Sequence, residues 1–122
     1  MAAPVAPPAG GTGDPEARAV LQAAMWRGVG VERDAEGLAA ARATLEGIVP
    51  GAGTETDNLL LVARLAAEAA DIRTESRGAH FRRDHPAADP GWARRIAWVG
   101  GRAVGLGPTG HQPVPSPDTE AA

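Results

Sequence analysis

The sequence contains no cysteine, and this absence excludes disulfide bonds and metal sites built from thiolates. It has no lysine either, so all twelve basic residues are arginine. The surplus of Arg, Ala, Gly and Pro indicates a coding bias rather than a function. No stretch reaches the apolar length of a membrane span, and the N-terminus lacks the charged and apolar regions of a secretory signal. We therefore expect a reducing, cytoplasmic setting.

A surplus of positive charge is also missing. The formal net charge is -3 at pH 7, so no basic field covers the chain and nucleic acid is not an expected partner. The 122 residues suffice for one small domain. We expect an Ala/Pro-rich disordered linker over residues 1–13 and a disordered tail over residues 106–122. Residues 14–105 remain, enough for one modest core.

Two helices are predicted in the first half of the chain. The first begins after a capping Asp14, which Pro15 follows, and ends at the glycines of "GVG". The second runs from a capping Asp34 to about Ile48 and is stopped by the Pro and Gly residues that follow. Leucine and alanine recur along both at helical spacing, which predicts one apolar face on each helix.

A third helix and a hairpin are predicted in the second half. The helix begins near Thr56 or Asp57 and continues to about Ser76, with Gly78 as its stop. In "RRIAWVGGRAVGL", apolar residues flank a Gly-Gly pair, which predicts a hairpin of residues 95–99 and 102–104. The fold class is therefore mainly α. We expect a three-helix, up-down-up bundle like a spectrin repeat, followed by a short hairpin or extended tail.

A dense group of charges, "DIRTESRGAHFRRDHP", ends the third predicted helix. Helical geometry continued to this point places Arg73 and Arg77 one turn apart on the apolar side, with no acid three or four residues away. Because an unpaired buried charge is costly, we expect them to pair elsewhere, with Asp34, Asp84, Asp89 or carbonyls of this chain, or with a second domain. Alternatively, they complement the helix dipole and extend into water.

We interpret this group as a polar cluster at an interface between domains. Its candidate members are Arg73, Glu75, Ser76, Arg77, His80, Arg82 and Asp84. Trp26 lies off the apolar face of the first predicted helix. It either folds over the loop that follows or docks on a surface outside this chain, and it is the candidate docking aromatic.

The familiar catalytic and metal-binding patterns are incomplete. His80 and His85 with the neighbouring aspartates fit no common metal-ligand spacing. Ser76, His80 and Asp84 are too close in sequence for a catalytic triad. The segments "GVGVER" and "GAGTET" lack the third glycine of G-x-G-x-x-G and follow no strand, so they are predicted to be turns between helices. We therefore expect no catalytic, cofactor-binding or metal-binding residue.

One segment resembles a known family. "TESRGAHFRRDHP" is similar to a pattern near the C-terminus of the succinate dehydrogenase, fumarate reductase and L-aspartate oxidase flavoproteins. That pattern is E-S-R-G-A-H, an aromatic or small residue, R, one residue, D, an aromatic and P. The matching residues are Glu75, Ser76, Arg77, Gly78, Ala79, His80, Arg82, Asp84 and Pro86. His85 departs from the pattern, because an aromatic is usual there.

A second segment distinguishes between these related flavoproteins. "MWRGVGVER" resembles the L-aspartate oxidase form, M-W-x-x-V-G-[IV]-x-R. The matching residues are Met25, Trp26, Val29, Gly30, Val31 and Arg33. The short link between the second and third predicted helices also favours the oxidase, since dehydrogenase subunits tend to be longer there. The resemblance covers about Ala17 to Ile96.

The resemblance implies a C-terminal helical domain of an FAD-dependent L-aspartate oxidase. The full family enzyme oxidises L-aspartate to iminoaspartate on the route to quinolinate and NAD. Its FAD sits in a Rossmann-like domain, and its substrate site lies between that domain and a capping domain. Both precede the matched region, so the resemblance assigns no catalytic residue here, and we expect this chain alone to bind no FAD. The implied partner is the flavin domain of the parent enzyme, in cis or as a split chain.

Other possibilities stay open at this stage. The chain could be the C-terminal domain of a fumarate reductase or succinate dehydrogenase flavoprotein subunit, or a free-standing helical interaction module. We expect a C-terminal piece of a larger protein. The alternative is a separate polypeptide that completes a split enzyme.

Overall fold

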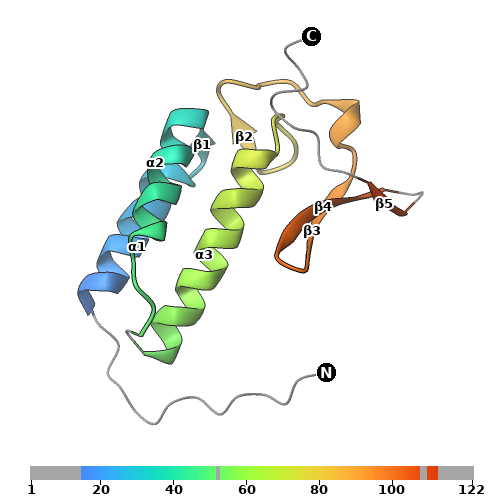
Figure 1. The fold of residues 1–122 in the computed structure, drawn as a ribbon. Helices are drawn as coiled ribbons and strands as arrows, with labels where there is room; N and C mark the ends of the chain where they lie inside the picture. Colours follow the sequence, from blue (N-terminus) through green and yellow to red (C-terminus); the bar gives the residue numbers. More distant parts are fainter. Residues whose placement is uncertain (1–14, 52, 108–109, 113–122) are drawn as a thin grey trace.

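The computed structural model describes residues 15–51, 53–107 and 110–112 of the 122. The predicted linker, residues 1–13, and most of the predicted tail lie outside these residues. Three helices come first along the described chain: α1 (Pro15–Gly28), α2 (Ala35–Glu46) and α3 (Thr54–Ile72). They run up, down and up, as Figure 1 shows, which confirms the predicted bundle.

The helix boundaries in the first half follow from local residues. Asp34 caps α2, and its Oδ1 accepts a hydrogen bond of 2.7 Å from the Gly37 amide. Gly28 ends α1 at the point where α1 crosses α2. A Cβ atom at Gly28 would lie 2.5 Å from the Gly37 carbonyl oxygen and 2.6 Å from the Ala41 Cβ, so only glycine permits this close crossing.

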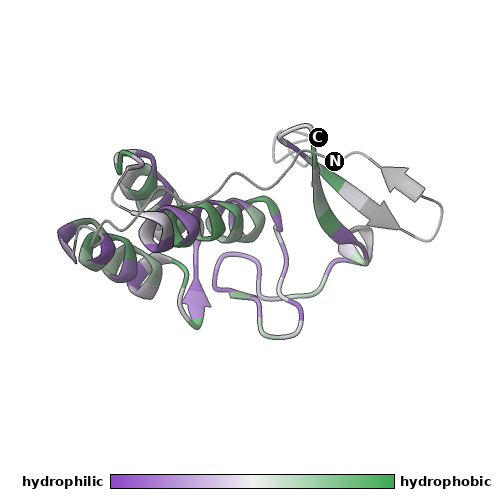
Figure 2. Ribbon diagram, turned by 90° about the horizontal axis from the view of Figure 1, so that it is seen from below, coloured by the Kyte–Doolittle hydropathy of each residue, from purple (hydrophilic) through white to green (hydrophobic). Residues whose placement is uncertain are grey.

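The core lies where the three helices face one another. Its buried members are Leu21 from α1, Leu45 from α2, and Leu60, Ala63 and Ala67 from α3. The small side chains of α3 bring the helix backbones close together. Figure 2 shows the strands of the C-terminal region on the side of α3 away from α1 and α2.

Helix α3 differs from its prediction at both ends. It begins at Thr54 rather than near Thr56 or Asp57, and it ends at Ile72 rather than about Ser76. Arg73 is the first residue outside it and has an extended backbone, with ψ of 94°. The helix stops there because the buried Arg82 guanidinium donates to the Asp71 carbonyl oxygen at 2.7 Å, which satisfies the last turn from outside the helix.

A two-residue parallel pairing joins distant parts of the chain. Strand β1 (Glu32–Arg33) lies between α1 and α2, and β2 (Phe81–Arg82) lies beyond α3. Glu32 pairs with Phe81, and Arg33 pairs with Arg82. The "GVGVER" segment therefore contacts the segment that follows α3, and it lies between helices as predicted.

The C-terminal region begins with a short 3-10 helix, η1 (Pro90–Trp92), and continues as an antiparallel sheet. Strands β3 (Arg95–Val99) and β4 (Arg102–Gly107) form the predicted hairpin. Gly100 and Gly101 both have positive φ, which a tight hairpin turn favours. The Trp98 Nε1 donates to Glu68 at 3.4 Å and links the hairpin to α3.

The sheet extends further than the sequence predicts. Strand β4 continues to Gly107, and a third strand, β5 (Gly110–Gln112), pairs with it. Both segments fall within the residues assigned to the disordered tail. Strand β5 is held by backbone pairing and has no alternation of apolar residues, so hydrophobic periodicity does not reveal it.

Candidate functional site

Glu75 stands at the centre of the polar cluster. Its carboxylate is fully buried and accepts hydrogen bonds from Arg73 Nη1 at 2.7 Å, Arg77 Nε at 2.9 Å and the Asp89 amide at 2.8 Å. Two guanidinium groups therefore share one buried counter-charge. Such charge-assisted bonds are among the stronger hydrogen bonds in proteins.

The prediction that Arg73 and Arg77 lack a nearby acid is wrong. It assumed that the helix continues past Ser76, whereas α3 ends at Ile72 and the extended backbone beyond it places Glu75 between the two arginines. Both find their partners within this chain, but the carboxylate is that of Glu75 and not of an expected aspartate, while backbone carbonyls take part as predicted.

Each arginine of the pair also bonds to the segment around η1. Arg73 donates to the Trp92 carbonyl oxygen at 2.8 Å and to the Arg94 carbonyl oxygen at 2.6 Å. Its guanidinium lies over the buried Trp92 ring, 5.1 Å from the centroid. Arg77 donates to the Asp89 carbonyl oxygen at 3.1 Å. The cluster therefore attaches η1 to the end of α3.

The charge state of Glu75 follows from a balance of effects. Burial raises the pKa of its carboxyl, whereas the hydrogen bonds from Arg77, the Asp89 amide and Arg73 lower it. The bonds prevail, so the pKa lies below its ordinary value. Glu75 is therefore a buried carboxylate that stays ionised at neutral pH, unlike a carboxylic acid poised to exchange a proton.

Arg82 and Asp84 form a second pair within the cluster. The Arg82 side chain is buried, and its Nε and Nη2 atoms donate to the two carboxylate oxygens of Asp84 at 3.0 and 2.7 Å. Asp84 also accepts from the Ala35 amide at 3.2 Å, at the start of α2. The hydrogen bonds from Arg82 lower the pKa of Asp84 and outweigh its desolvation. This pair links the end of α3 to the positive end of α2.

Ser76 fixes the tight turns that lie between these pairs. Its Oγ donates to the His85 carbonyl oxygen at 2.7 Å and accepts from the Arg82 amide at 2.9 Å. The hydroxyl is therefore committed to the backbone and is not directed at His80 as a nucleophile would be.

His80 links the cluster to the loop between α1 and α2. Its Nδ1 lies 2.9 Å from Arg33 Nη1, and its Nε2 lies 3.1 Å from the Arg73 carbonyl oxygen. Because a guanidinium only donates, Nδ1 accepts and Nε2 carries the proton. Burial lowers the pKa of His80; the hydrogen bond to the Arg73 carbonyl oxygen opposes this, and the nearby charges of Arg33, Arg82 and Arg73 lower the pKa further. The imidazole is therefore neutral at pH 7.

The structure brings together all seven predicted members of the cluster, but Trp26 is not among them. The Trp26 side chain is 84% exposed, so the alternative in which it folds over the following loop is wrong. It instead forms part of a hollow of about 670 Å³, which we call the Trp26 hollow. The lining residues are Trp26, Val29, Gly30, Val31, Glu32, Arg33 and Ala79.

Sequence reasoning did not find the role of Arg33. It donates to the Gly30 carbonyl oxygen at 2.9 Å as well as to His80, and so forms the boundary between the cluster and the Trp26 hollow. The match to the pattern M-W-x-x-V-G-[IV]-x-R had singled out Arg33 as part of the family resemblance. No local signal indicated its partner, because His80 lies 47 positions away.

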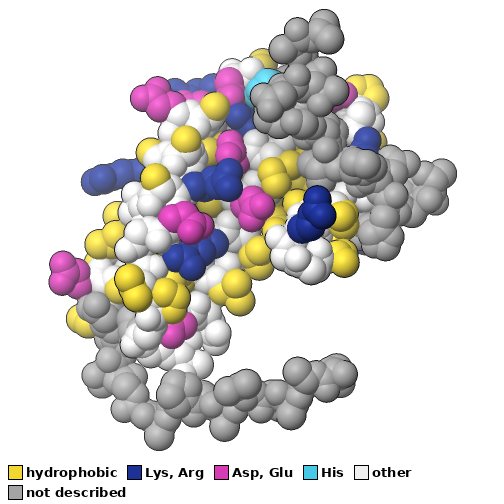
Figure 3. Space-filling view, in the orientation of Figure 1, with side chains coloured by type: hydrophobic (Ala, Val, Ile, Leu, Met, Phe, Trp, Pro, Cys, Tyr) yellow, Lys and Arg dark blue, Asp and Glu magenta, His cyan; other side chains and the backbone are white. Residues whose placement is uncertain are grey.

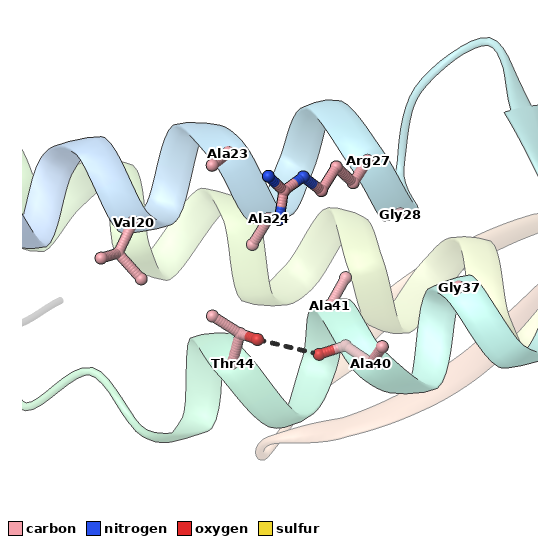
Figure 4. Close-up of a pocket in the computed structure, with 9 residues that line it drawn as sticks. All are labelled: Val20, Ala23, Ala24, Arg27, Gly28, Gly37, Ala40, Ala41 and Thr44. Atoms are coloured by element: carbon pink, nitrogen blue, oxygen red, sulfur yellow. Dashed lines mark hydrogen bonds between the residues drawn. The ribbon is translucent and has the colours of Figure 1, made fainter.

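A second hollow, of about 370 Å³, runs between α1 and α2. Figure 4 shows that its lining is mostly small and apolar, with Arg27 at one side and Thr44 at the other. The Thr44 hydroxyl is committed to the Ala40 carbonyl oxygen at 3.1 Å. This lining provides no pair of groups for acid-base or nucleophilic chemistry.

Charges of both signs are mixed on one face of the molecule (Figure 3). In the space-filling view of Figure 3, arginine and acidic side chains lie beside one another instead of forming a patch of one sign. Among the described residues, no group of three or more His, Asp or Glu side chains is arranged to hold a metal ion. None of the helices that the structure describes has the length and hydropathy needed to cross a membrane.

Comparison with known proteins identifies the family. The family model described as "Fumarate reductase flavoprotein C-term" matches residues 52–114, which is more than half of the chain. The chain belongs to this family of flavoprotein C-terminal domains. The resemblance found in "TESRGAHFRRDHP" is thereby confirmed at the level of the superfamily.

The relatives of this flavoprotein C-terminal domain named here include L-aspartate oxidases and a fumarate reductase subunit. This domain is 49% identical over 76 residues to "L-aspartate oxidase" of Rhodospirillum rubrum, covering 62% of this chain and 27% of the relative. It is 43% identical over 86 residues to "L-aspartate oxidase" of Caulobacter vibrioides, covering 70% and 16%. It is 34% identical over 98 residues to one subunit of the fumarate reductase (CoM/CoB) of Methanothermobacter marburgensis, covering 66% and 18%. The matched part is thus about a quarter or less of each relative.

Proposed function

We propose that this chain is the C-terminal helical domain of an FAD-dependent L-aspartate oxidase and that it supports the flavin domain without performing chemistry itself. The observation that carries the proposal is that the polar groups of the cluster are satisfied by one another and by the backbone. Among the described residues, every buried side-chain nitrogen and oxygen has a hydrogen-bond partner. The cluster therefore fixes a shape and leaves no buried group aimed at a substrate.

The described residues do not fit FAD. A dinucleotide site of the Rossmann type needs a glycine-rich turn between a strand and a helix in a parallel sheet. Here "GVGVER" runs from the last residue of α1 into β1, and the second half of "GAGTET" is the first turn of α3. The parallel pairing of β1 with β2 has only two residues in each strand. In the proposed enzyme, the flavin and the oxidation of L-aspartate to iminoaspartate belong to the other domains.

A fumarate reductase or succinate dehydrogenase flavoprotein is the second candidate, because one of the relatives belongs to a fumarate reductase. Against it stands the short connection between α2 and α3, which comprises only residues 47–53. Subunits that bind an iron-sulfur partner tend to be longer at this place. The oxidase therefore remains the preferred parent.

Complementation tests this proposal. The Caulobacter oxidase and the Methanothermobacter reductase chain are each truncated before the segment that matches this chain, and the chain is then fused at that point. We expect the oxidase fusion to retain flavin and to melt at a higher temperature than its truncated form. A larger gain for the reductase fusion would favour the second candidate. No gain in either fusion would refute the supporting role.

A further inference from the structure

The Trp26 hollow presents apolar side chains to solvent. Trp26 is 84% exposed and Val31 is 86% exposed. Phe81 on β2 is also exposed, and Ala79 lies in the wall of the hollow. Exposed tryptophan within a concave apolar surface is typical of the centre of a protein interface, where it contributes much of the binding energy.

The hollow is held in one shape by bonds behind it. Arg33 donates to the Gly30 carbonyl oxygen and to His80, and the Arg83 amide donates to the Arg33 carbonyl oxygen at 2.7 Å. Gly30 approaches α1 so closely that a Cβ atom would lie 2.7 Å from the Trp26 carbonyl oxygen. A surface fixed in advance loses little conformational entropy when a partner binds.

Two segments that the sequence analysis singled out meet at this hollow. Five of the six residues that match the oxidase pattern "M-W-x-x-V-G-[IV]-x-R" line it, and Ala79 of "ESRGAH" completes its wall. Trp26 and Val31 are exposed, so packing within the described residues does not account for their apolar side chains.

The partner follows from what surrounds this domain in its family. The chain belongs to a family of C-terminal domains and spans between 16% and 27% of the relatives named above. In each of these relatives the matched part is joined to a much longer chain, which is available to cover the hollow. An interface within one protein also suits a mixed rim, which here bears Glu32 and Arg33.

We infer that the Trp26 hollow is the surface on which the flavin domain of the parent enzyme docks, with Trp26 and Val31 as its central contacts. This inference rests on the proposed function and extends it by naming the contact surface. The seven-residue polar cluster then acts behind the interface, where it holds the wall of the hollow in place.

The test compares two exposed valines that lie in different interhelix loops. Val31 lies in the loop between α1 and α2, and Val49, which is 81% exposed, lies in the loop between α2 and α3 at the other end of the bundle. The full chain and its Val31→Asp, Val49→Asp and Trp26→Ser variants are titrated against the truncated Caulobacter oxidase by sedimentation. The same variants are placed in the fusion, where flavin retention and melting temperature are measured.

We expect Val31→Asp and Trp26→Ser to weaken binding at least about tenfold and to reduce flavin retention, because hot-spot truncations commonly cost that much. Val49→Asp should remain within about twofold of the unchanged chain, as expected of a residue outside the interface. Circular dichroism of each isolated variant shows whether it is folded, and the fusion reports on docking if the truncated oxidase does not fold.

Two results would overturn the inference while leaving the proposed function intact. One is that the fusions containing the unchanged chain, Val31→Asp and Val49→Asp show the same flavin retention and the same melting temperature. The other is a dimer of this chain that Val31→Asp dissociates while flavin retention in the fusion is unchanged, which would make a second copy the occupant. Absence of support by the unchanged chain would instead refute the proposed function itself.

Discussion

At the residue scale, one carboxylate determines the path of the chain beyond α3. Glu75 binds Arg73 on one side and Arg77 on the other, and its second oxygen accepts from the Asp89 amide. Removal of one partner from a buried ion pair leaves charge without compensation, and this costs more than the pair contributes. Substitution of the buried residue at the centre of the cluster should therefore cost more stability than substitution of an exposed residue at its edge.

The Glu75→Gln substitution should destabilise the chain by about 3 kcal/mol, because two arginines lose the charge that they share. The matched control is Glu55→Gln, since Glu55 is 72% exposed and pairs with Arg18 at the surface. A solvated pair contributes at most about 1 kcal/mol. Urea unfolding followed by circular dichroism measures both. Equal losses for the two variants would contradict a central role for Glu75.

His80 gives the chain a dependence on pH. Its folded-state pKa lies below the ordinary value of 6.5, because burial and the charges of Arg33, Arg82 and Arg73 oppose its protonation. The unfolded chain therefore binds the proton more readily. The stability contributed by neutral His80 is fully present above pH 6.5 and is lost as pH falls toward the folded-state pKa.

We expect the free energy of unfolding to fall between pH 7 and pH 5, with a slope of at most about 1.4 kcal/mol per pH unit for one proton. His80→Gln keeps a donor for the Arg73 carbonyl oxygen and cannot be protonated, so it should flatten this part of the curve. Glu75 and Asp84 have lowered pKa values and contribute only at lower pH. A curve that is equally steep in His80→Gln would assign the effect to another group.

At the scale of elements, the helices are joined by close approach and by arginine caps. Arg64 of α3 donates to the Leu45 and Ile48 carbonyl oxygens, each at 2.9 Å, and so satisfies the end of α2. Arg82 does the same for α3. Helices α1 and α2 instead meet at Gly28, where backbone touches backbone.

Gly28→Ala should destabilise the bundle by about 1–3 kcal/mol, because the new methyl group meets the Gly37 carbonyl oxygen and the Ala41 side chain. Alanine forms helix more readily than glycine, so the loss would reflect the crossing and not helix propensity. Gly47→Ala is the control, because its Cβ atom would lie 3.4 Å from the nearest atom, the Thr44 carbonyl oxygen. Thermal melts compare them, and a stable Gly28→Ala variant would show that the crossing can relax.

The elements also show how far sequence reasoning reaches. The Asp34 cap, the hairpin turn at Gly100–Gly101 and the three helices were predictable, because each depends on residues near one another in the chain. The end of α3 and strand β5 were not. The first depends on Arg82, ten residues beyond the helix, and the second on backbone pairing that leaves no periodic pattern.

The same division holds for the candidate site. The sequence singled out all seven members of the cluster, because so many charges are unusual beside a helix rich in alanine. The sequence did not predict that Glu75 lies at the centre, that η1 supplies carbonyl oxygens to Arg73, or that Arg33 reaches His80. These contacts exist only after the chain has turned back on itself.

At the scale of the whole molecule, shape and chemistry belong to different parts of the proposed enzyme. The chain spans a small share of its relatives, and its described hollows contain no cradle for a dinucleotide. Its contribution is a preformed surface at one end of a bundle. The isolated chain is therefore expected not to bind FAD, and this can be tested directly.

The purified chain, incubated with FAD and passed through a desalting column, should elute without flavin absorbance. The fusion to the truncated oxidase is the positive control, because it contains the domain that the proposal assigns to FAD. A stoichiometric yellow complex with the isolated chain would contradict the division of roles. It would require a flavin site that neither described hollow provides.

The contact between Arg33 and His80 has a consequence for synthesis. Its two residues lie 47 positions apart, so the ribosome releases Trp26 and Val31 well before it delivers Ala79 and His80. A nascent chain terminated within α3 would display the tryptophan without the wall of its hollow. If the flavin domain docks there, the complete docking surface forms only after translation has passed β2. Prematurely terminated chains would lack this surface and would not dock.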